Sequence, residues 1–480
     1  LREAPAARDL VGRAIHDDLE PTGEFESSSE LLNRLHANLV WGQRGNFVSV
    51  PTDCPQRDER LGWLGDAQVF ARTASYCMDV APFFTKWLRD VRDAQSVEGA
   101  FPDVAPRAVM SSDGAPGWGD AGVLIPWTLY EVYGDTRILA ESWASMEAWM
   151  RYMGDANPDG LRTRRLNMNF GDWLSVGAET PRELLATAYY ALDAGRMARA
   201  ADVLGKRDEA AAYRGLFERI RRAFVAAYVS GDGRVAGETQ TGYLLALHAG
   251  LVPEGMREAA VAHLVADLEA RGWHLSTGFL GVGLLAPVLT ENGRADVAYR
   301  LALQETYPSW GYSVKHGATT MWERWDGWTE ERGFQTPEMN SFNHYAFGSV
   351  GEWLYRFVAG IDVSAGRPGF AHVLLRPTPG RELTFAAARY RSVRGTIESR
   401  WELSGGELRY HAVLPPNTTG TLLLPTADPA GVLEGGQPVD GRAGVRRREG
   451  GRTPWVAEFE LDSGSFAFTC AAPEGGVLRG

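Results

Sequence analysis

The chain has 480 residues, which is enough for one large domain and at least one smaller one. Its 44% hydrophobic and 23% charged residues are ordinary for a globular protein and argue against a disordered or fibrous chain. The net charge of −12 disfavours binding to nucleic acid or anionic lipid, and a neutral substrate suits this balance better.

We expect residues 1–25 to be the end of an upstream β-domain or a linker. The stretch VGRAIHDDLEPTGEF resembles a last strand and its exit segment, and the chain begins with Leu, so we interpret it as a fragment. The opening LREAPAARDL lacks an apolar signal-peptide core, and no stretch approaches the roughly 18 apolar residues of a membrane span. We therefore expect no membrane partner.

Segments with helical periodicity follow, and we assign residues 26–361 to one all-α domain. In each segment, apolar residues recur at spacings of three and four. Thr180-Pro181 followed by Glu183 indicates a helix start, and Gly134 marks a helix end. The twelve predicted helices span 28–43, 65–79, 81–95, 121–134, 137–153, 181–203, 206–228, 235–249, 254–270, 278–290, 293–304 and 341–359.

Twelve helices joined alternately by short and long connections predict an (α/α)6 barrel, which is two concentric rings of six helices. We expect the long connections to gather at one end and line a pocket. They are rich in aromatic and acidic residues, and long loops in a compact domain are usually functional. These connections span 44–64, 98–120, 154–180 and 305–340.

Residues 362–480 have a different pattern, in which apolar and polar residues alternate between Gly, Pro and Asn turns. ELRYHAVLPPN and WVAEFELDSGSFAFTC are examples. This periodicity predicts a C-terminal all-β sandwich domain. The glycine-rich stretch 430–452 is predicted to be a loop.

The cysteines Cys54, Cys77 and Cys470 are an odd number at wide spacing. They match neither a disulfide framework nor a zinc-ligand pattern. Because an unpaired Cys is usually buried and inert, we expect three small buried side chains. This use of cysteine favours a reducing compartment, so we expect a cytoplasmic location.

The passage PTDCPQRDERLGWLGDAQ, residues 51–68, is the most informative one. It places four carboxylates and a Trp in a Gly- and Pro-containing loop that leads into a helix. A sugar needs a flat apolar surface for its C–H face and acceptors for its hydroxyls. The alternative is a solvated loop with ion pairs. The relevant residues are Asp53, Arg57, Asp58, Glu59, Arg60, Trp63 and Asp66.

A second passage, TTMWERWDGW at residues 319–328, sets three Trp around Glu323 and Asp326. Aromatic packing raises the pKa of a carboxyl group by desolvation, which suits an acid or base that works near neutral pH. The alternative is a Trp-rich edge of the core with Glu323 pointing to water.

Trp118, Trp173 and His344 lie in further aromatic segments. Taken singly, each fits a core residue better than a ligand contact. Taken together, four connections supply Trp-plus-acid groups, which favours a sugar site. No second His or Cys stands at metal-ligand spacing near His344, so we predict no metal and no cofactor. No GxSxG or GxxxxGK[ST] motif indicates acyl or nucleotide chemistry.

Six sequence blocks make the chain similar to the bacterial α-L-rhamnosidases over roughly residues 20–480. They are DCPQRDERLGWLGDAQ, FPDVAP at 101–106, GDW at 171–173, TGFLG at 277–281, MWERWDGW at 321–328 and SFNHYAFGSVGEWLY at 341–355. The resemblance implies an (α/α)6 barrel followed by a β-sandwich. It also implies hydrolysis of terminal α-L-rhamnosides with inversion at the anomeric carbon, on rhamnosylated small molecules or oligosaccharides.

The same resemblance implies a role for individual residues. Glu59 corresponds to the general acid and Glu323 to the general base. The sugar contacts correspond to Asp53, Arg57, Trp63, Asp66, Trp118, Trp173 and His344. Family members usually have β-domains before the barrel, sometimes with a calcium-dependent sugar-binding module, and the sequence printed here contains none of them.

We therefore expect a protonated Glu59 to donate to the leaving oxygen and an ionised Glu323 to activate water on the opposite face of the ring. An inverting pair stands roughly 6.5 to 9.5 Å apart, and a retaining pair about 5 to 5.5 Å. Two alternatives stay open. One is an inverting hydrolase for another terminal sugar, such as glucose or L-fucose. The other is a carbohydrate-binding protein without chemistry, against which the presence of both carboxylates argues.

Overall fold

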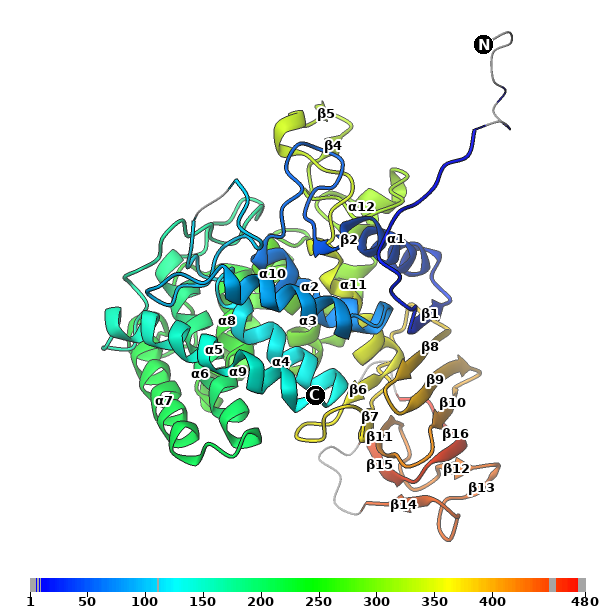
Figure 1. The fold of residues 1–480 in the computed structure, drawn as a ribbon. Coiled ribbons are helices and arrows are strands. Elements are labelled where there is room, and N and C mark those ends of the chain that lie inside the picture. The colour runs from blue at the N-terminus through cyan, green and yellow to red at the C-terminus, as the bar shows by residue number, and fades with distance from the viewer. Residues whose placement is uncertain (1–5, 7, 9, 110–111, 449–454, 474–480) are drawn as a thin grey trace.

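The computed structural model describes residues 6, 8, 10–109, 112–448 and 455–473. Figure 1 shows a helical part and a smaller part made of strands, which pack side by side. The predicted order, an all-α barrel followed by an all-β domain, is confirmed.

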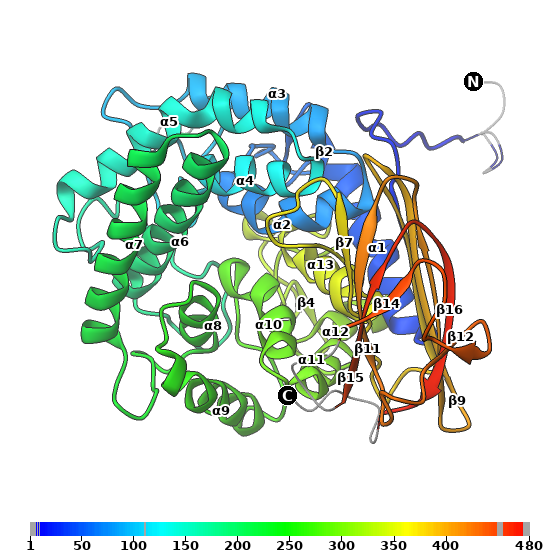
Figure 2. The ribbon, with the colours of Figure 1, turned by 90° about the horizontal axis from the view of Figure 1, so that it is seen from below.

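Two concentric rings of helices form the helical part, as the view along the barrel in Figure 2 shows. The inner ring contains α2 (Leu64–Cys77), α4 (Ala121–Tyr133), α6 (Arg182–Val203), α8 (Gln240–His248), α10 (Phe279–Glu291) and the helical segment 346–359. The outer ring contains α1 (Glu30–Asn46), α3 (Ala81–Asp93), α5 (Thr136–Ala156), α7 (Arg207–Tyr228), α9 (Glu254–Ala270) and α11 (Ala295–Ala302).

The two rings differ in the distribution of apolar residues. The inner helices α4, α8 and α10 bury most of their positions, whereas α7 in the outer ring buries only Ala210, Ile220 and Phe224. A helix that is apolar on all sides is stable only inside other elements, and an amphipathic helix can cover them. The sequence pattern therefore distinguishes α4, α8 and α10 of the inner ring from α7 of the outer ring.

All twelve predicted helices are present, with two differences at their starts. Residues 235–239 form a turn, and α8 begins at Gln240 because the Thr239 side chain caps the amide of Gly242. The last predicted helix begins at Ala346 rather than at 341, as a 3-10 turn (Ala346–Val350) that continues into α13 (Gly351–Trp353) and a π-helical turn (Leu354–Ala359). The short helix α12 (Trp310–Lys315), inside the connection 305–340, was not predicted.

Two sheets form the β part. The first has the order β1 (Gly23–Ser27), β8 (Phe385–Ser392), β9 (Gly395–Ser404), β10 (Glu407–Leu414), β16 (Gly464–Ala471), β12 (Leu433–Glu434) and β13 (Gln437–Pro438). The second has the order β14 (Val445–Arg447), β15 (Val456–Leu461), β11 (Thr419–Pro425), β7 (His372–Leu375) and β6 (Ile361–Val363). Within these sheets β11 pairs with β7 in parallel, and the other pairs are antiparallel.

Alternate residues of β9 and β10 are buried, and Trp401 and Tyr410 are among them, as expected for sheets that pack face to face. The stretch 430–452, predicted as a loop, contains the short strands β12, β13 and β14, and its residues 449–452 lie outside the described part.

Strand β1 links the start of the chain to the β part. Its residues pair with β8 from Gly23 opposite Tyr390 to Ser27 opposite Ala386. This strand crosses the boundary that we predicted between residues 25 and 26, so a segment at the start of the chain completes a sheet formed near its end. The domain boundaries 1–25, 26–361 and 362–480 stay predictions.

Four charged side chains join the barrel to the β part. Asp362 in β6 accepts from Arg72 of α2 at 3.0 Å, from Arg356 at 2.9 Å and from Arg376 at 2.6 Å. Burial raises the pKa of Asp362, but the charges of the three arginines outweigh that effect and hold the pKa well below its usual value. This cluster fixes the end of the last helical segment against the second sheet.

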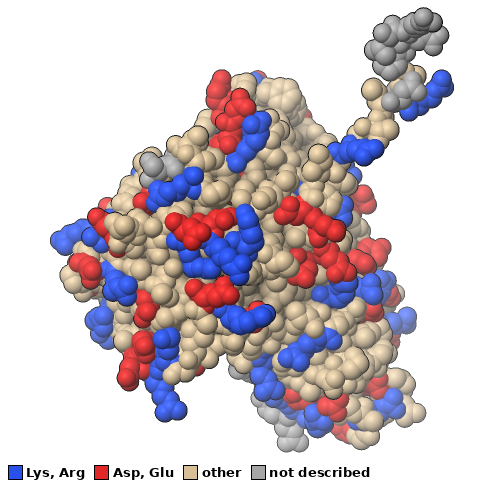
Figure 3. Space-filling model, viewed as in Figure 1, with Lys and Arg blue, Asp and Glu red and all other residues tan. Residues whose placement is uncertain are grey.

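The surface bears mixed charges. On the face in Figure 3, acidic and basic side chains are interspersed and form no continuous basic area. Within the described residues, no helix is both long and apolar enough to cross a membrane.

Candidate functional site

The long connections meet at one end of the barrel. Two small ribbons lie there, β2 (Phe47–Val48) with β3 (Val50–Pro51), and β4 (Trp328–Thr329) with β5 (Gly333–Phe334). Strands β4 and β5 are at the top of Figure 1, and β2 is lower, beside α1. Nearly all of the predicted site residues lie in these connections or in the first turn of an inner helix.

Arg57 connects the two predicted carboxylates. Its Nε donates to Glu59 Oε2 at 3.0 Å, and its Nη1 donates to Glu323 Oε2 at 3.1 Å. Its Nη2 also donates to Glu59. Arg57 and Glu323 are 266 positions apart in the sequence, so the fold brings two distant connections together around one guanidinium group.

Glu59 has two donors. Besides Arg57, the indole Nε1 of Trp63 donates to Glu59 Oε1 at 2.9 Å. Burial raises the pKa of Glu59, but the hydrogen bonds from Arg57 and Trp63 and the charge of Arg57 outweigh it, and the pKa lies below its usual value. Our expectation that Glu59 is kept protonated by its surroundings is therefore wrong for this arrangement. The aromatic neighbour acts as a hydrogen-bond donor, which favours the carboxylate.

Asp53 is the carboxyl group of the cluster whose pKa is raised. It is buried, accepts from the amide of Leu61 at 2.8 Å and makes a side-chain hydrogen bond with Glu59. Burial raises its pKa to about 7, the charge of His344 opposes this, and the carboxylates Asp66 and Glu59 add to it. The pKa values of the neighbouring carboxyl groups Asp53 and Glu59 are therefore shifted in opposite directions.

Glu323 is buried, with only 3% of its surface exposed. Its amide donates to the carbonyl of Ser341 at 2.9 Å, which ties the MWERW segment to the strand-like segment before the last helix. The thiol of Cys54 lies 4.0 Å from Glu323 Oε2. The structure therefore rejects the alternative in which Glu323 points to water.

His344 and Asp66 form a buried pair behind these carboxylates. The distance from His344 Nε2 to Asp66 Oδ1 is 2.9 Å, and Asp66 stands in the first turn of α2. Burial lowers the pKa of His344, but the hydrogen bond and charge of Asp66, together with Glu323 and Asp53, raise it above its usual value. The structure thus places the predicted His344 within the acidic cluster.

An aromatic wall lies beside Glu59. Trp63 meets Phe170 edge-to-face at 5.6 Å, and Phe170 contacts Trp118 at 4.7 Å and Trp173 at 6.2 Å between ring centroids. Trp63 and Trp173 are half-buried, whereas Trp118 is 3% exposed and packs over Gly65. The sequence analysis missed Phe170, although an aromatic residue directly before GDW was a signal for it.

Hydrogen bonds to the Asp172 carboxylate fix the position of the GDW segment. Asp172 accepts from the Thr241 hydroxyl, from the amide of Gly278 at 2.7 Å and from the amide of Leu280 at 2.8 Å. These amides belong to the start of α10, where a carboxylate is favourable. A Cβ at Gly278 would lie 2.1 Å from the carbonyl oxygen of Trp173, so only glycine permits this approach. Asp172 and Gly278 therefore position Trp173.

Three side chains of the cluster are of types that can bind a metal ion. Asp53, Cys54 and His344 each offer one ligand atom, within 4.8 Å of one another. Burial and the carboxylates Asp53 and Glu323 raise the pKa of the Cys54 thiol, which disfavours the thiolate that a metal needs. His344 Nε2 already faces Asp66. These donors do not fit a metal ion, and we derive no step through one.

All three cysteines are free and buried, which confirms that they are small buried side chains rather than a disulfide framework. They are Cys54, Cys77 and Cys470.

Comparison with known families gives two matches. Residues 20–358 match the model of the bacterial alpha-L-rhamnosidase 6 hairpin glycosidase domain, and residues 360–437 match that of the bacterial alpha-L-rhamnosidase C-terminal domain. The chain belongs to the bacterial α-L-rhamnosidase family. The resemblance inferred from the sequence blocks is thereby confirmed.

Individual relatives agree with this family. An alpha-L-rhamnosidase of Streptomyces avermitilis is 51% identical over 465 residues, covering 97% of this chain and 44% of the relative. One from Formosa agariphila is 40% identical, covering 88% of this chain and 46% of the relative. This rhamnosidase-family chain therefore spans about half the length of the curated relatives it matches.

Solved structures give the same result. The S. avermitilis alpha-L-rhamnosidase complexed with L-rhamnose matches with a TM-score of 0.90 at 50% identity, over 95% of this chain and 43% of that chain. The alpha-L-rhamnosidase from "Dictyoglumus thermophilum" also has a TM-score of 0.90, at 34% identity, over 98% of this chain and 52% of that chain.

Proposed function

We propose that this chain hydrolyses terminal non-reducing α-L-rhamnosides with inversion, with Glu59 as general acid and Glu323 as general base. The observation that supports this most is the position of Arg57, whose guanidinium contacts both carboxylates. The substrates would be rhamnosylated small molecules or oligosaccharides, because a relative at 50% identity is described in complex with L-rhamnose.

The two carboxylates lie near each other, because both accept hydrogen bonds from the one guanidinium group of Arg57. An inverting pair needs room for a water molecule, roughly 6.5 to 9.5 Å. Displacement of Arg57 by a sugar would leave that room between Glu59 and Glu323.

Proton donation involves Asp53 as well as Glu59. In this mechanism the leaving oxygen approaches the Glu59 oxygen that Arg57 contacts in the free protein, and substrate binding moves the guanidinium away. This removes the main interaction that holds the pKa of Glu59 low, and the proton of Asp53 is available through its hydrogen bond to Glu59. Glu59 then protonates the leaving oxygen while Glu323 takes a proton from the attacking water.

The remaining predicted residues form the proposed sugar pocket. Trp63, Phe170 and Trp173 would face the C–H side of the ring and its methyl group, and Asp53, Asp66 and His344 would bond its hydroxyls. Trp118 would support Phe170 from behind, since it is almost fully buried. A cytoplasmic location is proposed with this function, supported by the three free cysteines.

The deciding experiment is hydrolysis of p-nitrophenyl α-L-rhamnoside followed by NMR from the first seconds. Inversion predicts that β-L-rhamnose appears first and that the α-anomer grows later by mutarotation. First release of the α-anomer would contradict the assignment of Glu323 as a base.

The same assay separates the alternatives. A panel of aryl glycosides that includes glucoside and L-fucoside would identify another sugar. Binding of L-rhamnose without cleavage of any aryl glycoside would indicate a carbohydrate-binding protein.

A further inference from the structure

A second cavity lies inside the ring of inner helices. It has a volume of about 840 Å³ and is lined by residues of α2, α4, α6, α8 and α10, from Phe279 at the start of α10 to Glu291 at its end, and by residues 362–366. The proposed catalytic groups lie at or before the N-terminal ends of the inner helices. None of the predicted site residues lines this cavity.

One end of this cavity reaches the inner side of the proposed sugar site. Phe279 lines the cavity, and its ring lies 5.1 Å from the ring of His344. The cavity thus ends beneath the proposed sugar site, and the groups described below do not belong to that site.

Carboxylates in the lining already have partners. Asp362 binds Arg72, Arg356 and Arg376, Glu352 pairs with Arg356, and Asp202 pairs with Arg214 at 2.7 Å. Glu131 pairs with Arg72 at 3.5 Å, and Glu291 with Arg356 at 3.5 Å. These pairs leave no carboxylate of the lining without a cation.

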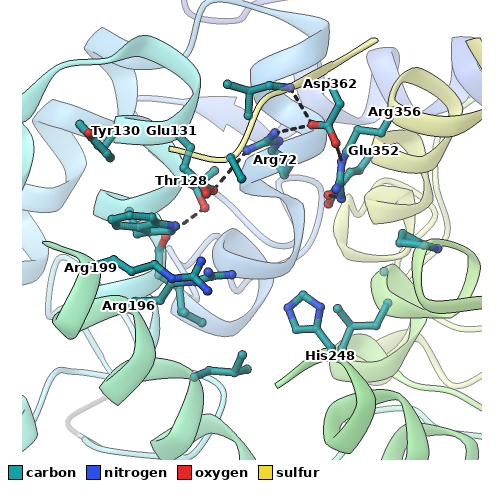
Figure 4. A pocket seen from close by; sticks show the side chains of 18 of the residues that line it. Arg72, Thr128, Tyr130, Glu131, Arg196, Arg199, His248, Glu352, Arg356 and Asp362 are labelled. Carbon is teal, nitrogen blue, oxygen red and sulfur yellow. Dashed lines mark hydrogen bonds and ion pairs between the residues drawn. The ribbon is translucent and has the colours of Figure 1, made fainter. Parts of the chain in front are cut away.

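Two arginines of the lining have no such partner. Among the described residues, neither Arg196 nor Arg199 forms an ion pair, and the guanidinium of Arg196 lies over the ring of Trp127, 5.8 Å from its centroid. Figure 4 shows both side chains extending from α6 toward the space that His248 faces. Burial lowers the pKa of Arg196; Glu131 and Asp193 oppose this, and the like charges of Arg199 and Arg72 add to it. Two neighbouring cations without a carboxylate attract an anion.

Further donors in the lining are unsatisfied. Trp127 is 7% exposed, and its Nε1 has no hydrogen-bond partner. The Nε atoms of Arg72 and Arg376 also lack one. His248 also lines the cavity, and its imidazole can offer one more N–H. An excess of donors requires a ligand that accepts hydrogen bonds.

We propose that this cavity binds a small organic carboxylate, with the carboxylate on Arg196 and Arg199. An apolar body would fill the other side, which Leu124, Leu245 and Leu284 line. The volume lies within the range of small-molecule sites, roughly 300 to 1,000 Å³. Arginine is suited to such a ligand because its planar fork bonds both oxygens of a carboxylate.

Calorimetric titration with benzoate tests the proposal, and benzamide, which has nearly the same shape without the charge, is the matched ligand. We expect saturable binding of benzoate and at least about tenfold weaker binding of benzamide, because benzamide forms no charge-assisted bond. Equal affinity for the two, or no saturable binding of benzoate, would overturn the proposal.

Variants locate the bound anion. Arg196→Gln and Arg199→Gln should each weaken benzoate binding by about tenfold or more. Arg222→Gln is the control, because it makes the same charge change on an exposed position of α7 outside the lining. Unchanged affinity in both test variants, or an equal loss in the control, would overturn the site.

Two variants test the site even if Arg196→Gln does not fold. Arg199 is exposed, so Arg199→Gln supplies a folded variant even if Arg196→Gln does not fold. Leu284→Trp should abolish benzoate binding by filling the apolar side while the arginines remain. Binding is measured without turnover, so the result does not depend on the proposed rhamnosidase activity.

Discussion

At the residue scale, the protonation of Glu59 is decided by its neighbours rather than by its burial. A carboxyl group beside a Trp was expected to be desolvated and protonated, but the Trp63 indole and the Arg57 guanidinium donate to it. Burial instead raises the pKa of the neighbouring Asp53, to about 7. In the proposed mechanism, acid catalysis therefore depends on both carboxyl groups.

Replacing Glu59 by Gln tests the acid. Turnover of rhamnosides with poor leaving groups should fall by roughly 10² to 10⁴, and turnover of aryl rhamnosides with good leaving groups should fall much less, because acid assistance matters most for a basic leaving oxygen. Steady-state kinetics on a leaving-group series measures this. Asp58→Asn is the control, since Asp58 is fully exposed, and equal losses across the series would refute the acid role.

Replacing Asp53 by Asn tests the shared proton. In the unmodified chain, the pair loses its proton as pH rises through about 7, so kcat/KM should decline on that alkaline side. In Asp53→Asn the side chain at position 53 does not titrate near pH 7, and its amide donates to an ionised Glu59. We therefore expect kcat to fall by roughly 10²-fold or more, and the decline of kcat/KM above pH 7 to disappear. A pH–rate profile with that decline unchanged would contradict the shared proton, and a change in KM alone would indicate only a sugar contact.

At the element scale, the connections are positioned by bonds to the starts of inner helices. Asp172 accepts hydrogen bonds from Thr241 in α8 and from amides at the start of α10, and Gly278 permits the close approach. Burial raises the pKa of Asp172, and the hydrogen bonds oppose that rise. The position of Trp173 is thus determined by helices that lie far from it in the sequence.

Replacing Asp172 by Asn should destabilise this arrangement. An amide offers one acceptor oxygen where the carboxylate offers two, and its NH2 group would face backbone N–H donors. We expect a loss of about 1 to 3 kcal/mol in the free energy of unfolding. Urea denaturation measures it, with Asp159→Asn in the exposed part of the same connection as the control. A stability equal to that of the control would mean that these bonds are not formed.

At the scale of the whole molecule, the barrel and the β part are joined through Asp362. This side chain is buried among three arginines from α2, the last helical segment and the strand β7 region. Asp362→Asn leaves those guanidinium groups without their shared carboxylate. We expect the free energy of unfolding to fall by about 3 to 5 kcal/mol. Thermal or urea unfolding measures the loss.

The pH dependence of stability gives a second readout for this joint. The pKa of Asp362 is lowered in the folded state, so its contribution is present above the unfolded pKa, about 3.9, and is lost as pH falls through the folded value. Between pH 7 and pH 3, Asp362→Asn should therefore lose less stability than the unmodified chain. Parallel curves for the two proteins would show that Asp362 does not supply this effect.

The sequence by itself was enough for the order of the domains, the twelve helices and the family. Helical and strand periodicities are local, and the blocks around Glu59 and Glu323 are long and specific, so neither needs tertiary information. The pairing of β1 with β8 was not predictable. The two strands lie more than 350 positions apart, and the local sequence pattern of β1 does not indicate its partner.

Only the tertiary structure decided the electrostatics of the site and the existence of the second cavity. The pKa of Glu59 depends on which atoms of Arg57 and Trp63 point at it, and Phe170 became a wall residue only through its contacts with three Trp rings. In the sequence, Arg196 and Arg199 are ordinary charged residues of a helix. Only the arrangement of the inner helices places them in the lining of one cavity. Periodicity records which residues are buried, but the directions of donors and acceptors arise where distant segments meet.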